Sequence, residues 1–337
     1  MKIAIVGASR IAQRTLEAWS SCKDVRIAGV LSRSEAHGRH IADRNSLPYL
    51  GSPDSAGNSE LSAFDAVYIT SNNSRHAPDM IRFLEAGKHV LIEKPLALTH
   101  SDAESAATLA EKKGLILQEG MMHRFHPELI AFKNTILSGE LGQLREVDLN
   151  FSFCLETHGR QRRTKKGGGG AMADLGCYLI DFLTWTFGTW TSSNITTRCI
   201  AELDSNGEKI DATTQTAFKL NDQLDVRLAC SISSPSINIW EARGTLGAAS
   251  IERNTPQEHR AFKITRVNED SLLTRDLLNQ KIEDSRLEAD NLFLFREEFL
   301  NFTEAVSGKS NPMISVQDSI QNARLLEQFI KETESSL

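Results

Sequence analysis

The sequence predicts an α/β protein whose N-terminal part forms a doubly wound parallel sheet and whose C-terminal part forms an α+β domain on an antiparallel sheet. Two observations predict this architecture. From residue 1 to about 120, short apolar runs alternate with segments of helical periodicity, which is typical of parallel strands joined by helices. After Gly120, apolar and polar residues alternate, for example over 147–153, as in half-buried antiparallel strands. We therefore expect one domain over 1–121 and a second over 122–337.

The first domain is expected to contain six strands with helical crossovers, as in a doubly wound nucleotide-binding sheet. Apolar residues recur at helical spacing after Gly7 and again before Gly87. Thr99 and Asp102 fit a capping box for a helix that reaches about Lys113. The strands are expected over Lys2–Val6, 25–31, 66–70, 89–92 and, as the sixth, 115–118.

In the second domain, one long apolar helix is expected from about Asp174, after a basic, glycine-rich loop. Strand-like alternation recurs downstream, and two helical segments close the sequence. We expect these last helices to pack back toward the first domain. The strands are expected over 213–220, 225–233, 237–242 and 248–251, and the two helices over 291–307 and 315–333.

Composition and charge argue against several classes of protein. The 337 residues are 40% hydrophobic and 24% charged, and no apolar run approaches the ~18 residues of a membrane span. A net charge of −6 disfavours nucleic-acid binding, which depends on phosphate contacts. The first residues read as a strand entering a glycine turn rather than as a signal peptide. Five cysteines without a CxxC pair favour a reducing compartment, so we expect a cytoplasmic protein without membrane or nucleic-acid partners.

The segment GASRIA, residues 7–12, stands between the first strand and the first helix. In a doubly wound sheet, a dinucleotide pyrophosphate lies there against the N-terminal amides of the helix. Gly7 allows the tight turn and Ala12 is small enough for close packing, whereas Ser9 stands where the fingerprint usually has its second glycine. These residues alone fit equally a strand–turn–helix unit that holds no ligand.

The end of the second strand distinguishes the two nicotinamide cofactors. NAD-binding sites usually carry an acidic residue there, which accepts from the ribose 2′-hydroxyl. This chain has Ser32 and Arg33 instead, a hydroxyl and a guanidinium that match a 2′-phosphate. Arg10, in the glycine turn, can reach the same group. The alternative is a solvated loop arginine, but the pattern favours NADP over NAD.

A lysine and a helix carry the candidate chemistry. Lys94, in an EKP tripeptide, follows a buried strand and is placed at the carboxyl end of the sheet, where ligands bind in this fold. Asp174, Tyr178 and Asp181 are spaced i, i+4, i+7 and so share one face of an otherwise apolar helix. Polar groups in such a place need partners or a wet cavity. The alternatives are a plain Lys-Pro turn, a capping Asp174 and a Tyr178 that belongs to the core.

Four segments, in this order, resemble the Gfo/Idh/MocA family of oxidoreductases: IVGASRIA, ITSNNSRHAP, EKPLALT and GGGGAMADLGCYLID. The resemblance covers nearly the whole chain, and EKP combined with the Asp-x-Gly-x-x-x-x-Asp helix is specific. It implies a Rossmann domain joined to an α+β domain with a large, mostly antiparallel, open sheet. It also implies a homodimer or homotetramer formed through that sheet.

The resemblance implies roles for single residues. Lys94 matches the family's catalytic or substrate-orienting lysine, and its bond to Pro95 is expected to be cis. Asp174 and Asp181 match residues that line the substrate pocket. His76 falls on a loop that passes near the nicotinamide.

Tyr178 departs from the commonest pattern, because many members have histidine there. Tyrosine is similar to the branch with glucose-fructose oxidoreductase, dimeric dihydrodiol dehydrogenase and some sugar 3-ketoreductases, which tend to use NADP, and it argues against close kinship with NAD-dependent inositol dehydrogenases. The expected substrate-binding residues are Lys94, Arg124, Arg163, Asp174, Tyr178 and Asp181. The expected cofactor-binding residues are Gly7, Ser9, Arg10, Ile11, Ala12, Ser32, Arg33, Thr70, Ser71, Asn72, His76, Glu93, Lys94 and Pro95.

The functional hypothesis is an NADP-dependent oxidoreductase that transfers hydride to or from a carbinol or carbonyl carbon of a sugar-like small molecule. Tyr178 would exchange the hydroxyl proton, Lys94 would polarise the oxygen and favour the phenolate, and Asp174 completes the catalytic set. Two alternatives stay open. One is a dehydrogenase of dihydrodiols or cyclitols, since fold and cofactor do not set the substrate. The other is an NADP-binding regulator without chemistry, although a regulator would be free to lose Lys94.

Other polar residues give weaker signals. His123 and His126 lie three residues apart, but no third ligand stands at a suitable spacing, so we expect no metal site. Arg124, between them, is expected to face the pocket. The basic residues before the glycine run suit either a lid over an anionic substrate or a solvated loop. They are His158, Arg160, Arg162 and Arg163.

Overall fold

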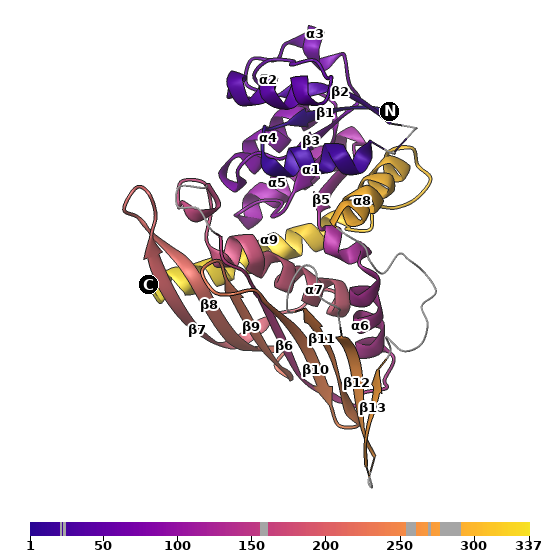
Figure 1. Ribbon diagram of the computed structural model, residues 1–337, viewed down its shortest axis with the longest axis vertical. Coiled ribbons are helices and arrows are strands. Elements are labelled where there is room, and N and C mark those ends of the chain that lie inside the picture. The colour runs from indigo at the N-terminus through magenta and orange to yellow at the C-terminus, as the bar shows by residue number, and fades with distance from the viewer. Residues whose placement is uncertain (21, 23–24, 156–160, 254–260, 269–270, 277–290) are drawn as a thin grey trace. The chain divides into compact units, whose positions relative to one another are not determined.

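The computed structural model describes residues 1–20, 22, 25–155, 161–253, 261–268, 271–276 and 291–337 (Figure 1). The chain divides into two compact units, each of which is described by itself. The first comprises Met1–Phe125 and Ala289–Arg324, and the second comprises His126–Glu288 and Leu325–Leu337. His158 and Arg160 lie outside the described residues.

The first unit is built on a five-stranded parallel sheet with the order β2-β1-β3-β4-β5. Helices connect the strands, as predicted for a doubly wound sheet. Its elements are β1 (Lys2–Val6), α1 (Arg10–Trp19), β2 (Arg26–Leu31), α2 (Glu35–Arg44), α3 (Asn58–Leu61), β3 (Ala66–Ile69), α4 (Asn73–Glu85), β4 (His89–Glu93), α5 (His100–Lys113), β5 (Leu117–Gly120), η1 (Met122–Phe125) and α8 (Asn291–Val306).

The expected number of six strands is wrong for the described part of this unit, whose sheet has five. The difference lies between β2 and β3, where Tyr49 makes an isolated parallel bridge with Val30. Val30 N donates to Pro48 O (2.9 Å), and Leu50 N donates to Val30 O (2.8 Å). Pro48 has no N–H to donate, and Gly51 follows with a φ of 93°, so the pairing does not extend into a strand.

Side-chain caps fix the starts of helices α1 and α5, and the sequence predicts the second of them. The Ser9 hydroxyl accepts from Ala12 N (3.2 Å) at the start of α1. Thr99 accepts from Asp102 N (3.2 Å) at the start of α5, and Gly114 ends that helix with a left-handed φ of 64°. These contacts satisfy backbone groups that have no partner within the helix. The turns that precede both helices are therefore fixed locally.

Two apolar clusters cover the two faces of this sheet. One packs strand residues against α4 and α5, and the other packs them against α1, α2 and α8. Trp19 of α1 stacks on Phe299 of α8, with ring centroids 3.8 Å apart and planes at 12°. Trp19 Nε1 also donates to Phe295 O (3.1 Å). The late helix α8 therefore completes the core of the first unit.

The second unit is built on an eight-stranded sheet with the order β13-β12-β11-β10-β6-β9-β8-β7. Its neighbouring strands are antiparallel except for β6 and β9, which confirms the mostly antiparallel sheet. Its elements are α6 (Pro127–Leu137), β6 (Leu144–Ser152), η2 (Gln161–Arg163), η3 (Met172–Gly176), α7 (Cys177–Phe187), β7 (Ser192–Leu203), β8 (Lys209–Leu220), β9 (Leu224–Ser231), β10 (Ile237–Gly244), β11 (Gly247–Arg253), β12 (Ala261–Asn268), β13 (Ser271–Asp276) and α9 (Val316–Ser335), whose residues up to Arg324 count with the first unit.

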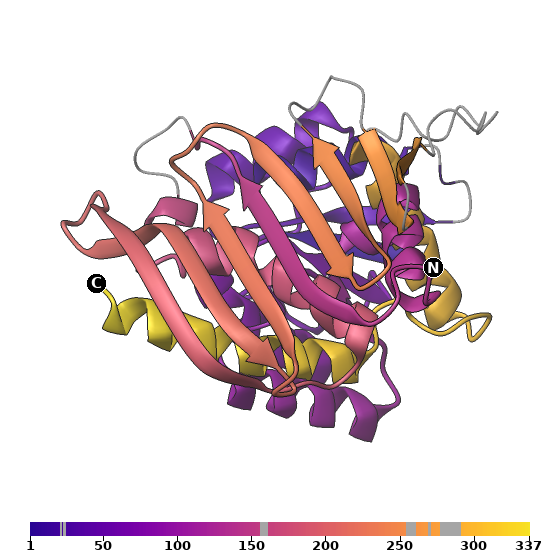
Figure 2. The same cartoon turned by 90° about the horizontal axis from the view of Figure 1, so that it is seen from below.

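Helices α6 and α7 pack on one face of this sheet. Trp240 of β10 contacts Phe182 of α7, with 4.8 Å between ring centroids. Along the same strand, Ile237 and Ile239 point to the opposite face and are each 38% exposed. Figure 2 looks onto that face, over which none of the described helices of this unit lies. The sheet is therefore open on one side.

Two features of this unit differ from what the sequence predicts. The strand β7 has no predicted counterpart, because Ser and Thr interrupt its apolar alternation at the edge of the sheet. The segment 172–176 forms a π-helical turn before α7 begins at Cys177. A Cβ at Gly176 would overlap Met172 Sδ, so a larger residue there would displace the Met172 side chain. Among the described residues, no helix is both long enough and apolar enough to cross a membrane.

Candidate active site

The turn between β1 and α1 lies against the end of β3. Gly7 has a φ of 109°, and a Cβ there would lie 2.8 Å from Thr70 Oγ1 and 3.0 Å from Ser71 N. Only glycine fits this close approach. Helix α1, capped by Ser9, begins directly after the turn and places the positive end of its dipole there. These residues fit the pyrophosphate of a dinucleotide.

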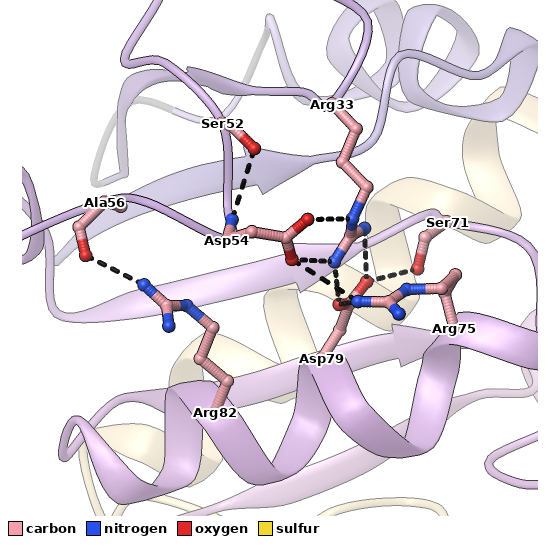
Figure 3. A network of polar contacts seen from close by, with 8 residues as sticks. All are labelled: Arg33, Ser52, Asp54, Ala56, Ser71, Arg75, Asp79 and Arg82. Carbon is pink, nitrogen blue, oxygen red and sulfur yellow. Dashed lines mark hydrogen bonds and ion pairs between the residues drawn. The ribbon is translucent and has the colours of Figure 1, made fainter.

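Arg33, at the carboxyl end of β2, lies in a network of charged side chains (Figure 3). Its Nε and Nη2 donate to the two carboxylate oxygens of Asp54 (2.8 and 2.6 Å). Its Nη1 and Nη2 donate to those of Asp79 (3.2 and 2.6 Å). Arg75 Nη2 lies 3.3 Å from Asp54 and 3.4 Å from Asp79, and Ser71 Oγ donates to Asp79 (2.8 Å). Arg33 is therefore an ion-paired residue and not a solvated loop arginine.

The ion pairs change the acid–base properties of this network. Partial burial opposes the charge of Arg33, but hydrogen bonds to Asp79 and Asp54 raise its pKa above the ordinary value. The hydrogen bond from Arg33 lowers the pKa of Asp54. The donors suit a 2′-phosphate, as the sequence suggested, but they already serve two carboxylates that the sequence did not single out.

The loop after β4 carries Lys94. The Lys94–Pro95 bond is cis, as the resemblance implied. Directly after it, Leu96 N donates to Glu119 Oε1 (2.7 Å), and Glu119 is 1% exposed. The backbone around the lysine is therefore held by a buried carboxylate, while the lysine side chain is partly exposed.

His76, on α4, joins this loop to the end of β3. Its Nδ1 lies 2.7 Å from Pro95 O, and its Nε2 lies 3.0 Å from Ser71 O. The ring is fully buried, and burial lowers the pKa of His76 although both carbonyls favour the charged form. A neutral imidazole carries one N–H and donates to one of the two carbonyls. His76 thus brings together two loops that the sequence assigned to the cofactor.

Three glutamates lie close together in the first unit, at the ends of β4 and β5 and on α8. Tyr68 donates its hydroxyl to Glu93. Glu298, on α8, is 1% exposed. Burial raises the pKa of Glu298 well above its ordinary value, and the charges of Glu93 and Glu119 raise it further. Its environment therefore favours the protonated form of Glu298 more than water would. No sequence pattern predicts this cluster, because α8 is remote along the chain.

In the second unit, η3 and α7 carry the predicted substrate residues. Asp174 and Asp181 are 2% and 0% exposed, although the segment is apolar. Tyr178 is partly exposed, and its ring meets that of Phe151 edge-on at 5.7 Å. Buried carboxylates are costly unless they are paired, so the surrounding residues must compensate them.

Arg162 provides such a partner for Asp174. Its Nε donates to both carboxylate oxygens (2.9 and 2.8 Å), and its Nη2 also pairs with Oδ2. The guanidinium lies over the ring of Phe153, 5.4 Å from its centroid. Gly170 N donates to Arg162 O (3.0 Å) and so turns the loop back toward Asp174. The sequence grouped Arg162 with the other basic loop residues, because the pairing depends on how the glycine run folds.

Two arginines that were expected to bind substrate are engaged within their own units. Arg163 is 7% exposed and donates to Glu202 Oε2 and Ile232 O, both at 2.7 Å. Arg124 is 1% exposed and donates to Asp318 Oδ2 (2.7 Å). Both contacts hold structural elements together. A role in substrate binding stays a prediction for both residues.

The paired histidines lie in buried positions. His126 caps α6 by accepting from Glu128 N at Nδ1 (3.2 Å), and His123 is 7% exposed. In the part of the chain that the structure describes, no group of three or more His, Cys, Asp or Glu residues is arranged to hold a metal ion.

Two sequence-family models match the chain. The oxidoreductase family with an NAD-binding Rossmann fold matches residues 1–121, and the GFO/IDH/MocA C-terminal domain matches residues 130–250. The fold and the matched segments define an oxidoreductase with a Rossmann domain. Both models describe the same family and together span most of the sequence. The chain belongs to the GFO/IDH/MocA family.

Several known proteins are similar to this chain. Trans-1,2-dihydrobenzene-1,2-diol dehydrogenase of Mus musculus is 29% identical over 56% of this chain, and the match spans 55% of that protein. D-xylose 1-dehydrogenase (NADP(+)) 2 of Haloferax volcanii is 24% identical over 99% of this chain and 98% of its own length. A crystal structure of a 3-ketoreductase from Actinomadura kijaniata with NADP and TDP-benzene has a TM-score of 0.81 at 22% identity, over 99% of this chain and 97% of that chain. This structural similarity confirms the predicted fold.

Proposed function

We propose that the protein is an NADP-dependent oxidoreductase that transfers hydride to or from a carbinol or carbonyl carbon of a sugar or sugar-derived substrate. The observation that carries the proposal is the presence of two buried carboxylates, Asp174 and Asp181, on the apolar segment that also bears Tyr178. Membership in an oxidoreductase family supports it. So do the relatives, which include an NADP-dependent xylose dehydrogenase and a 3-ketoreductase.

The proposed mechanism assigns one task to each residue. A bound nicotinamide supplies or accepts the hydride. Tyr178 gives or takes the hydroxyl proton at its phenolic oxygen, and Lys94 polarises the same substrate oxygen. Arg162 holds the carboxylate of Asp174 in place, so that its remaining lone pairs can orient substrate hydroxyls. The fixed backbone around Lys94 limits the positions that its ammonium group can take.

The test is a spectrophotometric screen for reduced nicotinamide, with NADP beside NAD, over aldoses, sugar acids, inositols and dihydrodiols. Tyr178→Phe and Lys94→Met are each expected to lower kcat by about 10²–10⁴-fold, as for the loss of a general acid–base group. Both variants should still bind the cofactor, because neither change removes the glycine turn.

Lys112→Met is the matched control, since it removes a lysine charge from the exposed side of α5. It should turn over substrate at the wild-type rate. Near-normal turnover in Tyr178→Phe or Lys94→Met would contradict the assigned roles. Turnover confined to dihydrodiols or inositols would show that these compounds, and not sugars, are the substrates. NADP binding without any turnover would favour a regulator.

The cellular setting and the assembly belong to the same proposal. We place the protein in the cytoplasm, which the free thiols of all five cysteines support. We also propose a homodimer or homotetramer that forms through the open face of the second sheet. Exposed Ile200 (65%), Ile237 and Ile239 (38% each) support this, because apolar strand faces are usually covered. Light scattering of the purified protein measures its mass, and a monomer would contradict the proposal.

A further inference from the structure

The charged network at the end of β2 joins three segments of the first unit (Figure 3). Arg33 follows β2, Asp54 lies in the segment before α3, and Asp79 and Arg75 belong to α4. The hydrogen bond from Arg33 lowers the pKa of Asp54, and the charges of Arg75 and Arg82 lower it further. Asp54 is therefore an anion at neutral pH, held among cations.

The two carboxylates of the network differ in how firmly they are held. The Asp79 side chain is 1% exposed and accepts hydrogen bonds from Arg33, Arg75 and Ser71. Moving the Asp79 carboxylate away from these donors would leave a buried charge without partners, which is costly. The Asp54 side chain is 54% exposed, and water can replace its partners. Exposed ion pairs of this kind contribute only about 0.2–1 kcal/mol. Asp54 is thus the member that a ligand can displace.

The edge of Arg33 that faces Asp54 has the geometry that recognises a phosphate. Asp54 takes Nε and Nη2 in a two-point contact at 2.8 and 2.6 Å. A phosphate takes the same two donors of a guanidinium in the same parallel arrangement. The other edge of Arg33 is anchored on Asp79, so the guanidinium stays in place when Asp54 leaves.

Charge balance decides which ligands can compete for this edge. Arg33 and Arg75 together offset Asp54 and Asp79, so the four side chains carry no net charge. A phosphate dianion would gain little from a neutral network while Asp54 remained. Once Asp54 moves into water, two cations face a single buried anion and attract the dianion. A 2′-hydroxyl carries no charge and cannot drive that exchange.

We propose that Asp54 is a built-in competitor for the 2′-phosphate of the cofactor and thereby sets the selectivity between NADP and NAD. It occupies the Arg33 edge when no cofactor is bound, and a 2′-phosphate displaces it. A nucleotide without this phosphate leaves the Asp54–Arg33 pair intact. This inference rests on the proposed function, which assigns Arg33 to the cofactor.

The test uses two nucleotide fragments, adenosine 2′,5′-bisphosphate and adenosine 5′-monophosphate, with the full-length protein in a calorimeter. Asp54→Asn removes the competing charge and keeps the size of the side chain. It should bind the bisphosphate more tightly by up to about fivefold, the upper limit expected for release of one exposed ion pair. Binding of the monophosphate should change by less than about twofold. Asp43→Asn, an equal charge change on the exposed side of α2, should leave both affinities unchanged.

Each other outcome contradicts a defined part of the argument. Weaker bisphosphate binding in Asp54→Asn would show that Asp54 orients Arg33 for the ligand and does not compete with it. Equal tightening for both nucleotides would show a general charge effect. If the wild type does not prefer the bisphosphate but Asp54→Asn does, the competition stands and the NADP assignment fails. If neither protein prefers the bisphosphate, the proposed competition and the NADP assignment both fail. The hydride-transfer screen with NAD then still tests the reaction itself.

Discussion

Asp211, on β8, is a partly buried acid that contacts the start of the segment bearing the candidate catalytic tyrosine. Its Oδ2 accepts from Met172 N (2.7 Å), the first residue of η3, and from Thr214 Oγ1 (3.1 Å). Burial raises the pKa of Asp211 to about 6, although these hydrogen bonds oppose the shift. The folded protein therefore holds this proton at pH values where the unfolded chain has released it.

The sign of the resulting pH dependence follows from linkage. Between the unfolded pKa of 3.8 and the folded pKa of about 6, the folded state binds more protons, so the free energy of unfolding falls as pH rises. The loss reaches about 3 kcal/mol above this window. Asp211→Asn keeps an acceptor for Met172 N and should remove this decrease in the free energy of unfolding. Urea unfolding from pH 4 to 7.5 measures the free energy in both proteins.

Glu208→Gln, an exposed change after the turn that follows β7, is the control and should follow the wild type. If Asp211→Asn also follows the wild type at every pH, Asp211 does not retain its proton on folding.

For single residues, the sequence predicts the contacts whose partners are close along the chain. Thr99 caps its helix by a contact three residues away, as expected. Arg162 and Asp54 escaped prediction because their partners are 12 and 21 residues away and meet only after the loops have folded. Lys94 and Tyr178 stay predictions, since their roles require the bound substrate.

At the scale of elements, the glycine run before η3 shows how a loop is fitted to a strand. Gly170 has a φ of 115°, and a Cβ there would overlap Asp211 Oδ1. Both the backbone conformation and the space exclude a side chain. The run thus lets the chain pass directly over β8 before it enters the helical segment.

Gly170→Ala should lower the free energy of unfolding by about 2–4 kcal/mol, the combined cost of backbone strain and overpacking. Gly207→Ala is the matched control, because Gly207 has a φ of 78° but a Cβ added there would meet no atom within 4 Å. It should lose only about 1 kcal/mol, from the backbone alone. Chemical denaturation compares the two variants. An equal loss in both would show that Asp211 moves aside without cost.

Elements with strong periodicity are predicted well, and weakly patterned ones are not. The helices α8 and α9 lie close to their expected ranges, and β8, β9 and β10 begin or end within a few residues of theirs. The strand β7 escapes prediction because its residues are mainly polar, and the bridge at Tyr49 takes the place of the sixth strand. In both cases, pairing with a neighbouring strand decides the structure, and that pairing is invisible in the local pattern.

At the scale of the whole molecule, the chain enters each unit twice. Residues 289–324 belong to the first unit, although they follow all the strands of the second sheet in the sequence. The apolar cluster on one face of the first sheet includes Phe295, Phe299 and Phe302 of α8. The Rossmann part of the sequence is therefore continuous, but its core is not.

A fragment of residues 1–125 should fail to unfold cooperatively, because the face of its sheet around Trp19 lacks the aromatic side chains of α8. The same fragment joined to 289–324 through a flexible linker should recover a sigmoidal urea transition. Circular dichroism follows both transitions. A cooperative transition in the short fragment would contradict the assignment of α8 to this core.

The position of α8 also has a consequence for synthesis on the ribosome. All five strands of the first sheet have been made by Gly120, but the helix that covers one of its faces ends at Val306. At roughly 5–20 residues per second, the gap amounts to about 10–40 s. During that time the nascent sheet exposes an apolar face around Trp19. Chaperone binding to this face is expected to end when α8 emerges, so the core of the first unit is completed only after the strands of the second sheet have been made, although its sequence is read first.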